Sequence, residues 1–404
     1  MASNSPPPSS PVFDIHEHTI QASHIREYPR ATATSQDDAL LLHVKQYIPK
    51  HGGPARKGDI TIIGAHANGF PKVTSWLDYA RDIAHLINTI RPPRPLIAMG
   101  HSFGANALTN VALMHPRLFT GFIMLDPVIA RFAGAPHHPQ NQQQLPEAFP
   151  NPASLSITRR DTWPSRAAAR EAFLSRPFYR DWDPRVLDLF VQYGLRDDDA
   201  VSPTSKDNQS KSQDPSPPVR LTTTKHQEVF TFIRPLWPAI DPTTNTITNP
   251  SLIPDHDFDP QTLIQTPIYR PEQNATFLRL PHLRPPVLYI FGGTSTVSPP
   301  RLVKEKLDTT GVGAGGSGGT RAGRVKHVIH PESGHLVPLE KPLFCAKAAA
   351  EWTKTEIERW WEEEKAYEEW TNKSLEEKST IDHELRRRVE LASSKKNSKA
   401  KANL

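Results

Sequence analysis

Short apolar runs alternate with amphipathic stretches along the first third of the chain and again near residue 300. The runs are rich in β-branched residues and short enough for strands that are buried on both faces of a sheet. Trp76–Ile90 places apolar residues at helical spacing and stops before Pro92-Pro93, and Ala105–Leu113 predicts a second helix. Repeated strand–helix order is typical of the α/β class, in which helices cover a mostly parallel sheet. The predicted strands are His18–Pro29, Ala39–Pro49, Asp59–Ala65, Pro95–Met99, Gly121–Leu125, Pro286–Phe291 and Val325–Ile329.

The alternation stops between residues 131 and 284. This segment is rich in proline and in clusters of Asp, Ser and Thr, and it is too long for a simple loop. Helical patterns occupy residues 164–193, whereas residues 201–219 have the polar, Pro/Ser-rich composition of a disordered loop. We interpret 131–284 as a cap or lid inserted into the α/β core, whose two parts are then residues 13–130 and 285–350.

The two ends of the chain differ from the middle in composition. Residues 1–12 are Ser/Pro-rich without the basic and apolar regions of a secretory signal, so they predict a disordered leader. Residues 351–392 give one long helical pattern with charged faces and several tryptophans that would pack part of it on the core. Residues 393–404 predict a basic, disordered tail.

Composition excludes several classes of protein. The single cysteine, Cys345, rules out an internal disulfide framework and a multi-cysteine zinc site. No apolar run is long enough for a transmembrane segment, and the mean hydropathy is −0.53. The formal net charge of +5 comes mainly from four lysines in the last ten residues, so no nucleic-acid partner is predicted. We therefore expect a soluble, intracellular protein.

A glycine-flanked serine carries the strongest chemical signal. Gly100-His101-Ser102-Phe103-Gly104 follows a predicted strand and opens a predicted helix. A tight turn in that setting holds the serine Oγ out at the carboxyl edge of the sheet, and the helix N-terminus behind it favours developing negative charge. Small residues flank the serine because backbone atoms crowd such a turn. Ser102 is the candidate nucleophile, and an ordinary glycine-rich strand–helix turn is the competing interpretation.

Backbone N–H donors for a developing oxyanion are expected in two places. One is the amide of Phe103, the residue after the candidate nucleophile. The other is the loop His66-Ala67-Asn68-Gly69-Phe70, which directly follows the strand Asp59–Ala65. Within this loop we assign Asn68 as the donor and His66 as a structural residue.

Position in the chain, rather than abundance, selects the general base among 18 histidines. His335 follows the strand Val325–Ile329 and comes last in the order nucleophile, acid, histidine. His330 is the nearest competitor, but it lies at the strand end, where a packing or capping role is expected. His335 is therefore the candidate base.

The acid departs from the commonest arrangement. The turn Gly292–Ser298, where such an acid usually follows its strand, contains no carboxylate. Asp126 instead follows the strand Gly121–Leu125, at the edge where parallel sheets place their sites. A buried aspartate there needs a partner, and the His335 imidazole would supply one. We assign Asp126 as the acid; a capping role for Asp126 and the weaker candidate Glu332 are the alternatives.

Two weaker patterns do not indicate a cofactor. Gly311–Gly316 fits the glycine spacing of a dinucleotide loop, but it does not lie between a strand and a helix. The acidic clusters Asp255–Asp257 and Asp197–Asp199 lack a partnered set of metal ligands. No organic cofactor and no metal are predicted.

Four phrases carry a wider resemblance: HANGFPK, GHSFGANALTNVALMHPRLF, MLDPVI and SGHLVPLEKP. They resemble the α/β-hydrolase superfamily and, more narrowly, fungal peroxisomal serine hydrolases such as the yeast peroxisomal lipase and the hydrolases of Alternaria toxin clusters. The resemblance covers residues 14–350 and implies that Ser102, Asp126 and His335 fall on the triad motifs of an α/β-hydrolase fold. It also implies hydrolysis of an ester, lipid or acyl-thioester bond in peroxisomes.

The same resemblance indicates a deletion. Ser102 comes only 32 positions after Phe70, whereas the fold normally places a helix, a strand, a second helix and a second strand there. The chain therefore predicts the loss of one helix–strand unit between residues 70 and 76. The sheet would then carry a gap between its second and third strands.

Three functions follow as hypotheses. The first is a serine hydrolase that cleaves an ester, lipid or acyl-thioester bond through an acyl-enzyme, in peroxisomal lipid or secondary (toxin) metabolism. The second, motivated by the deletion, is a catalytically impaired binding or scaffold protein. The third is an acyltransferase that uses the same triad with another acceptor in place of water.

The partners expected are a small acyl or lipid-like substrate and a peroxisomal import receptor. Ala402-Asn403-Leu404 has the small first and apolar last residue of the S-K-L class of address, although Asn403 lacks the usual positive charge. We therefore predict a weak peroxisomal signal, with the cytoplasm as the alternative location.

Overall fold

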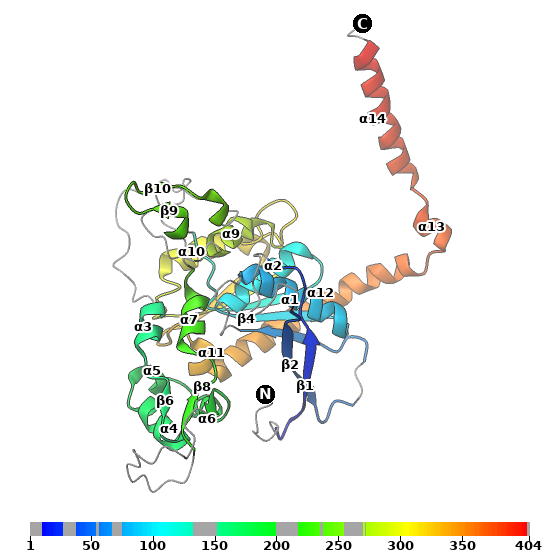
Figure 1. The fold of residues 1–404 in the computed structure, drawn as a ribbon. Coiled ribbons are helices and arrows are strands. Elements are labelled where there is room, and N and C mark those ends of the chain that lie inside the picture. Colours follow the sequence, from blue (N-terminus) through cyan, green and yellow to red (C-terminus); the bar gives the residue numbers. More distant parts are fainter. Residues whose placement is uncertain are drawn as a thin grey trace. The chain divides into compact units, whose positions relative to one another are not determined.

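Five short parallel strands form a central sheet in the order β12-β11-β5-β4-β3 (Figure 1). The computed structural model describes residues 10–26, 38–53, 56–66, 75–131, 152–198, 217–234, 237–253, 270 and 272–401, with the backbone alone after residue 392. β5 and β11 are buried along their whole length and read as continuous apolar runs, as expected for strands covered on both faces. The strands are β3 (Thr61–Ala65), β4 (Leu96–His101), β5 (Gly121–Leu125), β11 (Val287–Gly292) and β12 (Val325–His330).

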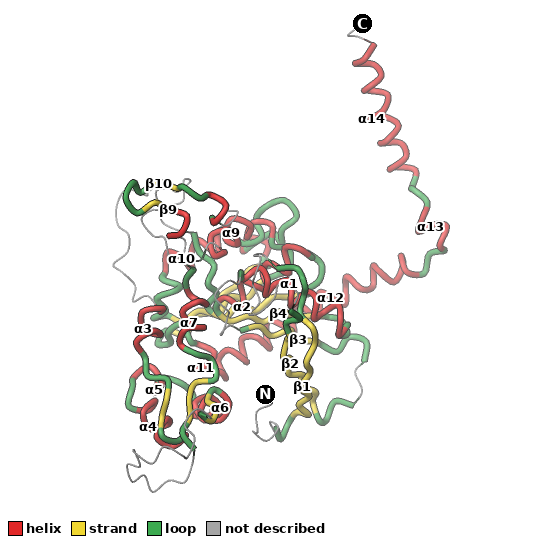
Figure 2. Tube along the Cα trace, viewed as in Figure 1, coloured by secondary structure: helices red, strands yellow, loops and turns green. Residues whose placement is uncertain are grey.

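Helices cover this sheet, so the α/β-hydrolase architecture predicted from the sequence is confirmed. Figure 2 shows the strands gathered in the middle with helices around them. Apolar residues of α1 (Trp76–Ile90) and α2 (Phe103–Met114) join those of the sheet in one buried core. α10 (Pro300–Thr309) connects β11 to β12, and Val303 places it in the same core. α1 begins where predicted because Ser75 and Asp78 form a capping box at its first turn.

The N-terminal strands form a separate hairpin. β1 (Phe13–Gln21) pairs with β2 (Leu41–Pro49) in a two-stranded antiparallel sheet. The residues after β1 are joined to α1, because Arg26 binds the carboxylate of Asp82 at 2.9 Å and the amide of Ser23 donates to it.

No strand among the described residues pairs with the outer edge of β3. β3 is bonded to β4 on one side, and the hairpin forms no ladder with it. Ile60 and Ile62 are 44% and 53% exposed, which is unusual for β-branched residues at a sheet. The open edge agrees with the predicted gap between the second and third strands, whereas residues 67–74, which include the place of the predicted helix–strand deletion, lie outside the described residues.

The segment between β5 and β11 has its own elements. A small core of aromatic and aliphatic side chains joins its helices to a three-stranded sheet in the order β6-β8-β7. Val219, predicted in the disordered loop 201–219, instead begins β8, whereas residues 199–216 lie outside the described residues. The elements are α3 (Pro152–Thr158), β6 (Thr162–Trp163), α4 (Arg166–Leu174), α5 (Pro177–Arg180), α6 (Pro184–Tyr193), β7 (Leu195–Asp197), β8 (Val219–Leu221), α7 (Lys225–Phe232), β9 (Ile240–Asp241), β10 (Thr246–Ile247) and α9 (Glu272–Arg279), with short 3₁₀ turns at Trp237–Ala239, Pro250–Leu252 and Leu280–His282.

The C-terminal segment is helical for longer than predicted. The chain divides into two compact units, Met1–Thr353 and Lys354–Leu404. After the short α11 (Val337–Glu340), α12 (Pro342–Thr371) runs through that boundary, and α13 (Leu375–Ser379) and α14 (His383–Lys401) follow. The single helix predicted for 351–392 is thus broken after Thr371, where Ser374 caps a new helix. The tail predicted as disordered from residue 393 continues α14 to Lys401, because its Ala, Lys and Ser residues include no Gly or Pro.

Candidate active site

Ser102 sits in a sharp turn between β4 and α2. Its backbone has φ 55° and ψ −125°, a conformation that side-chain-bearing residues rarely adopt. A Cβ at Gly100 would overlap the backbone of Ala105, and one at Gly104 would overlap the carbonyl of Ala65. The two flanking glycines are therefore required by close backbone approach, as the motif predicted.

Three residues predicted from the sequence meet at the carboxyl edge of the sheet. The Oγ of Ser102 lies 2.9 Å from Nε2 of His335, and Nδ1 of that ring lies 2.6 Å from Oδ2 of Asp126. Ser102 follows β4, Asp126 follows β5, and His335 follows β12. The parallel register brings these strand ends together, because β5 pairs with both β4 and β11 and β11 pairs with β12.

The carboxylate of Asp126 is completely buried. Besides His335, its Oδ2 accepts a hydrogen bond of 2.5 Å from the hydroxyl of Ser295. Ser295 belongs to the turn after β11, in which the sequence contains no acid, and its Oγ accepts from the amide of Val297. The turn thus contributes a donor to the acid rather than the acid itself, a role that the motif did not indicate.

His101 is a second histidine beside the triad. Its Nε2 lies 3.0 Å from the carbonyl oxygen of His335, and the two rings are 5.0 Å apart between centroids. Burial, and next the charge of nearby His335, lower the pKa of His101 to about 4. In its neutral form the ring donates a hydrogen bond from Nε2–H to that carbonyl, which holds the backbone of His335, the candidate base.

The other predicted site residues are placed less completely. Phe103 begins α2 with its ring buried, so its amide is at the helix N-terminus, whereas Asn68 lies outside the described residues. His66 ends the described part of its loop, and its carbonyl accepts from the hydroxyl of Tyr79 at 3.2 Å. The competing base His330 bonds Ser333 and packs against Phe344, and the competing acid Glu332 is exposed.

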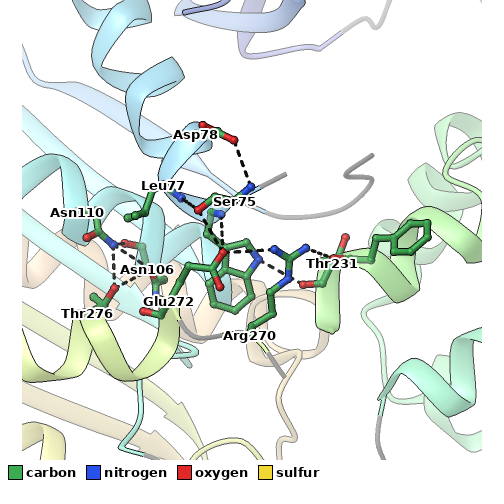
Figure 3. A network of polar contacts seen from close by, with 11 residues as sticks. Ser75, Leu77, Asp78, Asn106, Asn110, Thr231, Arg270, Glu272 and Thr276 are labelled. Carbon is green, nitrogen blue, oxygen red and sulfur yellow. Dashed lines mark hydrogen bonds and ion pairs between the residues drawn. The ribbon is translucent and has the colours of Figure 1, made fainter. Parts of the chain in front are cut away.

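A buried polar network supports the start of α1 (Figure 3). Glu272 is 1% exposed, and its Oε1 accepts from the amide of Trp76 at 3.1 Å and from the hydroxyl of Ser75 at 3.3 Å. The Arg270 guanidinium, also 1% exposed, lies 3.3 Å from the same oxygen and donates to the carbonyl of Phe230. An anion at a helix N-terminus is stabilised by the aligned backbone dipoles.

This network reaches the residue after Ser102 through Trp76. The indole ring stacks on Phe103 with centroids 5.0 Å apart and planes at 16°, and its N–H donates to the carbonyl of Thr231. A separate set of amide and hydroxyl bonds joins Asn106 of α2 to Thr276 of α9. The segment returning from the predicted cap therefore fixes both helices that flank the elbow, an arrangement that no local pattern in the sequence indicated.

One cavity of about 3360 Å³ opens onto Ser102 and His335. Its walls come from the aromatic cluster of α5 and α6, from α1, and from the facing strands β2 and β3. Leu336 and Leu339, which follow His335, pack against the core of the segment that carries α4 to α6. Six arginines are among the described residues that line the cavity: Arg91, Arg131, Arg159, Arg160, Arg176 and Arg301.

The fold and this site define a hydrolase: the profile of the alpha/beta hydrolase family matches residues 48–348, and the chain belongs to that family. Among named proteins, it is 35% identical to the type I acyl-CoA thioesterase mpaH of Penicillium roqueforti, over 89% of this chain and 92% of that protein. It is 26% identical to the abhydrolase domain-containing protein AFT2-1 of Alternaria alternata, over 64% of this chain and 83% of that protein.

A solved structure supports the fold independently. The peroxisomal α/β-hydrolase Lpx1 of Saccharomyces cerevisiae matches with a TM-score of 0.56 and 15% identity, over 92% of this chain and 100% of that one. Among the described helices, none is long and apolar enough to cross a membrane. The resemblance to fungal α/β-hydrolases inferred from four phrases of the sequence is thereby confirmed.

Proposed function

We propose that this chain is a serine hydrolase that cleaves acyl-thioester or carboxylic ester bonds through an acyl-enzyme on Ser102. The observation that carries the proposal is the continuous chain of contacts from Ser102 through His335 to Asp126, at 2.9 and 2.6 Å. The Ser102 hydroxyl attacks the carbonyl carbon while Nε2 of His335 takes its proton. Buried Asp126 holds the ring and stabilises the imidazolium that forms.

The second half of the reaction uses the same groups in reverse. Acylation ends when His335 gives its proton to the departing thiol or alcohol. In deacylation His335 accepts a proton from water as that water attacks the acyl-enzyme, and it returns this proton to the Ser102 Oγ as the acyl–oxygen bond breaks and the carboxylic acid leaves. The amide of Phe103, at the N-terminus of α2, and the loop containing Asn68 are the proposed donors to the oxyanion. We propose segment 131–284 as the cap that covers this chemistry, since α5 and α6 line the cavity above Ser102.

A coenzyme A thioester is the substrate class we favour within this reaction. The relative with 35% identity is named an acyl-CoA thioesterase. Arg131, Arg160 and Arg176 in the cavity wall suit the phosphates of such a leaving group. We further propose peroxisomal location through Ala402-Asn403-Leu404, which lie outside the described residues, and a role in fungal lipid or secondary metabolism.

The decisive experiment combines active-site labelling with three variants. A fluorophosphonate probe should label the wild-type protein, and Ser102→Ala should lose both labelling and roughly six orders of magnitude in kcat. Asp126→Asn should lower kcat by roughly four orders of magnitude, because the tautomer of His335 is no longer fixed. Glu332→Gln is the matched control and should retain activity, since that residue is exposed and the His335 ring bonds Asp126 and Ser102 instead.

The kcat/KM for an acyl-CoA is compared with that for the p-nitrophenyl ester of the same acyl group. The larger value shows whether the protein prefers thioesters or esters. An unlabelled, inactive but folded wild-type protein would favour the catalytically impaired binding protein. Activity that survives in Ser102→Ala would reject the nucleophile. Transfer of the acyl group to an added alcohol or thiol, in place of hydrolysis, would favour the acyltransferase.

A further inference from the structure

The cavity that opens onto Ser102 is larger than a small ester requires. Pockets for small ligands usually have volumes of about 300–1000 Å³, whereas this one has about 3360 Å³. Its lining extends beyond the triad and the predicted cap onto β2, β3 and α1. This extension coincides with the unpaired edge of β3, so the gap in the sheet is continuous with the candidate active site.

One face of α1 forms a wall of that extension. Tyr79, Ile83, Leu86 and Ile90 are spaced so that they fall on one side of the helix, and all four line the cavity. We call this row the α1 stripe. The eleven steps from Tyr79 to Ile90 correspond to about 16 Å along the helix axis. The stripe includes Ile90, which is 40% exposed although it is a large apolar residue.

The N-terminal end of the α1 stripe lies beside the elbow. The ring of Tyr79 packs edge-on against Phe103 with centroids 6.3 Å apart, and its hydroxyl donates to the carbonyl of His66. A chain that leaves the carbonyl at Ser102 can therefore enter the extension next to Tyr79 and follow the stripe toward Ile90. The facing wall contributes further apolar residues, Val44 and Ile48 of β2.

The polar groups of this extension do not indicate a charged ligand. Asp82 lies beside the stripe, but its carboxylate is already bound by Arg26 and by the amide of Ser23. Lys45, Asp59 and Arg91 also line the cavity here, but aliphatic side chains of β2, β3 and α1 outnumber the charged ones, which favours an apolar occupant. Because the extension is continuous with the Ser102 site, its occupant is the part of the substrate that is attached to the reacting carbonyl.

We propose that the groove between the α1 stripe and the open edge of β3 binds the hydrocarbon chain of long acyl substrates. This inference rests on the proposed function, and it adds a binding site and two specificity-determining residues. Leu86 lies midway along the stripe and Ile90 at its far end. A larger side chain at either position shortens the acyl chain that fits, and the one at Leu86 shortens it more.

A chain-length series tests the groove. The kcat/KM is measured for butyryl, octanoyl and palmitoyl p-nitrophenyl esters on the wild type, Leu86→Trp and Ile90→Trp. The palmitoyl-to-butyryl ratio should fall roughly tenfold or more in both variants, since each buried methylene excluded costs several-fold in binding. The octanoyl-to-butyryl ratio should fall in Leu86→Trp and change less in Ile90→Trp.

Two comparisons identify the groove as the cause. Leu278→Trp places the same ring at a 39% exposed position outside the cavity lining, and it should leave both ratios unchanged. Leu189→Trp places it on α6, at the opposite wall of the cavity. Ratios that respond to Leu189→Trp and not to the two groove variants would overturn the proposal and move the acyl chain under the predicted cap.

A binding measurement keeps this test separate from catalysis. A fluorescent long-chain fatty acid is titrated into the Ser102→Ala protein and into Ser102→Ala combined with Leu86→Trp. Tenfold weaker binding in the double variant supports the groove even if no ester is turned over, which would count against the proposed function alone. Equal binding by both proteins, with both still folded by circular dichroism, overturns the groove.

Discussion

A single histidine next to Ser102, the proposed nucleophile, is held in its neutral state by its surroundings. His101 faces His335, Asp126 and His66, and the burial of its ring is the largest cause of its lowered pKa. A neutral donor to the His335 carbonyl suits a site in which a second positive charge beside the base would oppose formation of the imidazolium. We therefore interpret His101 as a positioning residue for His335, the proposed base.

Substitution of His101 should change how stability depends on pH. Between pH 6.5 and about 4 the unfolded chain binds a proton at this position that the folded chain does not. The free energy of unfolding should therefore fall by at most about 3 kcal/mol as the pH falls through this window. Below about pH 4, His101 is protonated in both states and causes no further change. In His101→Gln the amide can still donate to the carbonyl, and the acid-side loss should be smaller. Thermal unfolding of both proteins across the window measures the difference; identical pH profiles would contradict the assignment.

Sequence context identified the residues with local signals and missed those defined by distant contacts. Ser102 and His335 each follow a predicted strand within a recognisable phrase, and Asp126 follows from strand order. Ser295 could not be assigned, because its role depends on the approach of the turn after β11 to Asp126, 169 residues earlier. The role of Glu272 could not be assigned for the same reason: it lies near the C-terminal end of the long insertion and accepts a hydrogen bond from the hydroxyl of Ser75, 197 residues earlier.

At the scale of elements, the start of α1 depends on a buried ion pair. Glu272 and Arg270 are each 1% exposed, and the carboxylate caps the first turn of the helix whose Trp76 stacks on Phe103. Breaking a buried pair leaves an uncompensated charge, which is more costly than removing both charges together.

We expect Glu272→Gln to lower the free energy of unfolding by about 3–5 kcal/mol. Glu228→Gln is the matched control, because Glu228 pairs with an arginine, Arg159, that is 23% exposed; it should lose less. The double variant Glu272→Leu/Arg270→Met should recover part of the loss. Chemical denaturation measures the free energy of unfolding of all three variants. Equal losses for the two single variants would show that the buried pair at α1 contributes no more to stability than the partly exposed pair.

The bounds of elements with a clear local pattern of apolar residues were predicted closely, whereas the bounds of elements without such a pattern were not. Trp76–Ile90 and Gly121–Leu125 were predicted at their observed bounds, since capping and continuous apolar burial define them. The first strand was expected at His18–Pro29 but occupies Phe13–Gln21, because its pairing with β2, rather than its own pattern, sets its limits.

At the scale of the whole molecule, the two edges of the central sheet are protected differently. The β12 edge carries Lys326, His327 and His330, polar side chains of the kind that discourage pairing with another sheet. The β3 edge, TIIGA, carries no charged residue, and Ile62 is more than half exposed.

Because no described strand covers this edge, we expect the protein to self-associate as its concentration rises. An unpaired, apolar strand offers backbone donors and acceptors to the same strand of another molecule, and aggregation should begin there on heating or during expression. Ile62→Lys should reduce concentration-dependent light scattering, whereas Ile329→Lys, at an exposed position of the already polar β12, should change it little. Equal scattering in the wild type and both variants would place the cause elsewhere. The expected result would mean that the open edge of β3, proposed above as a wall of the acyl groove, also limits the solubility of the protein.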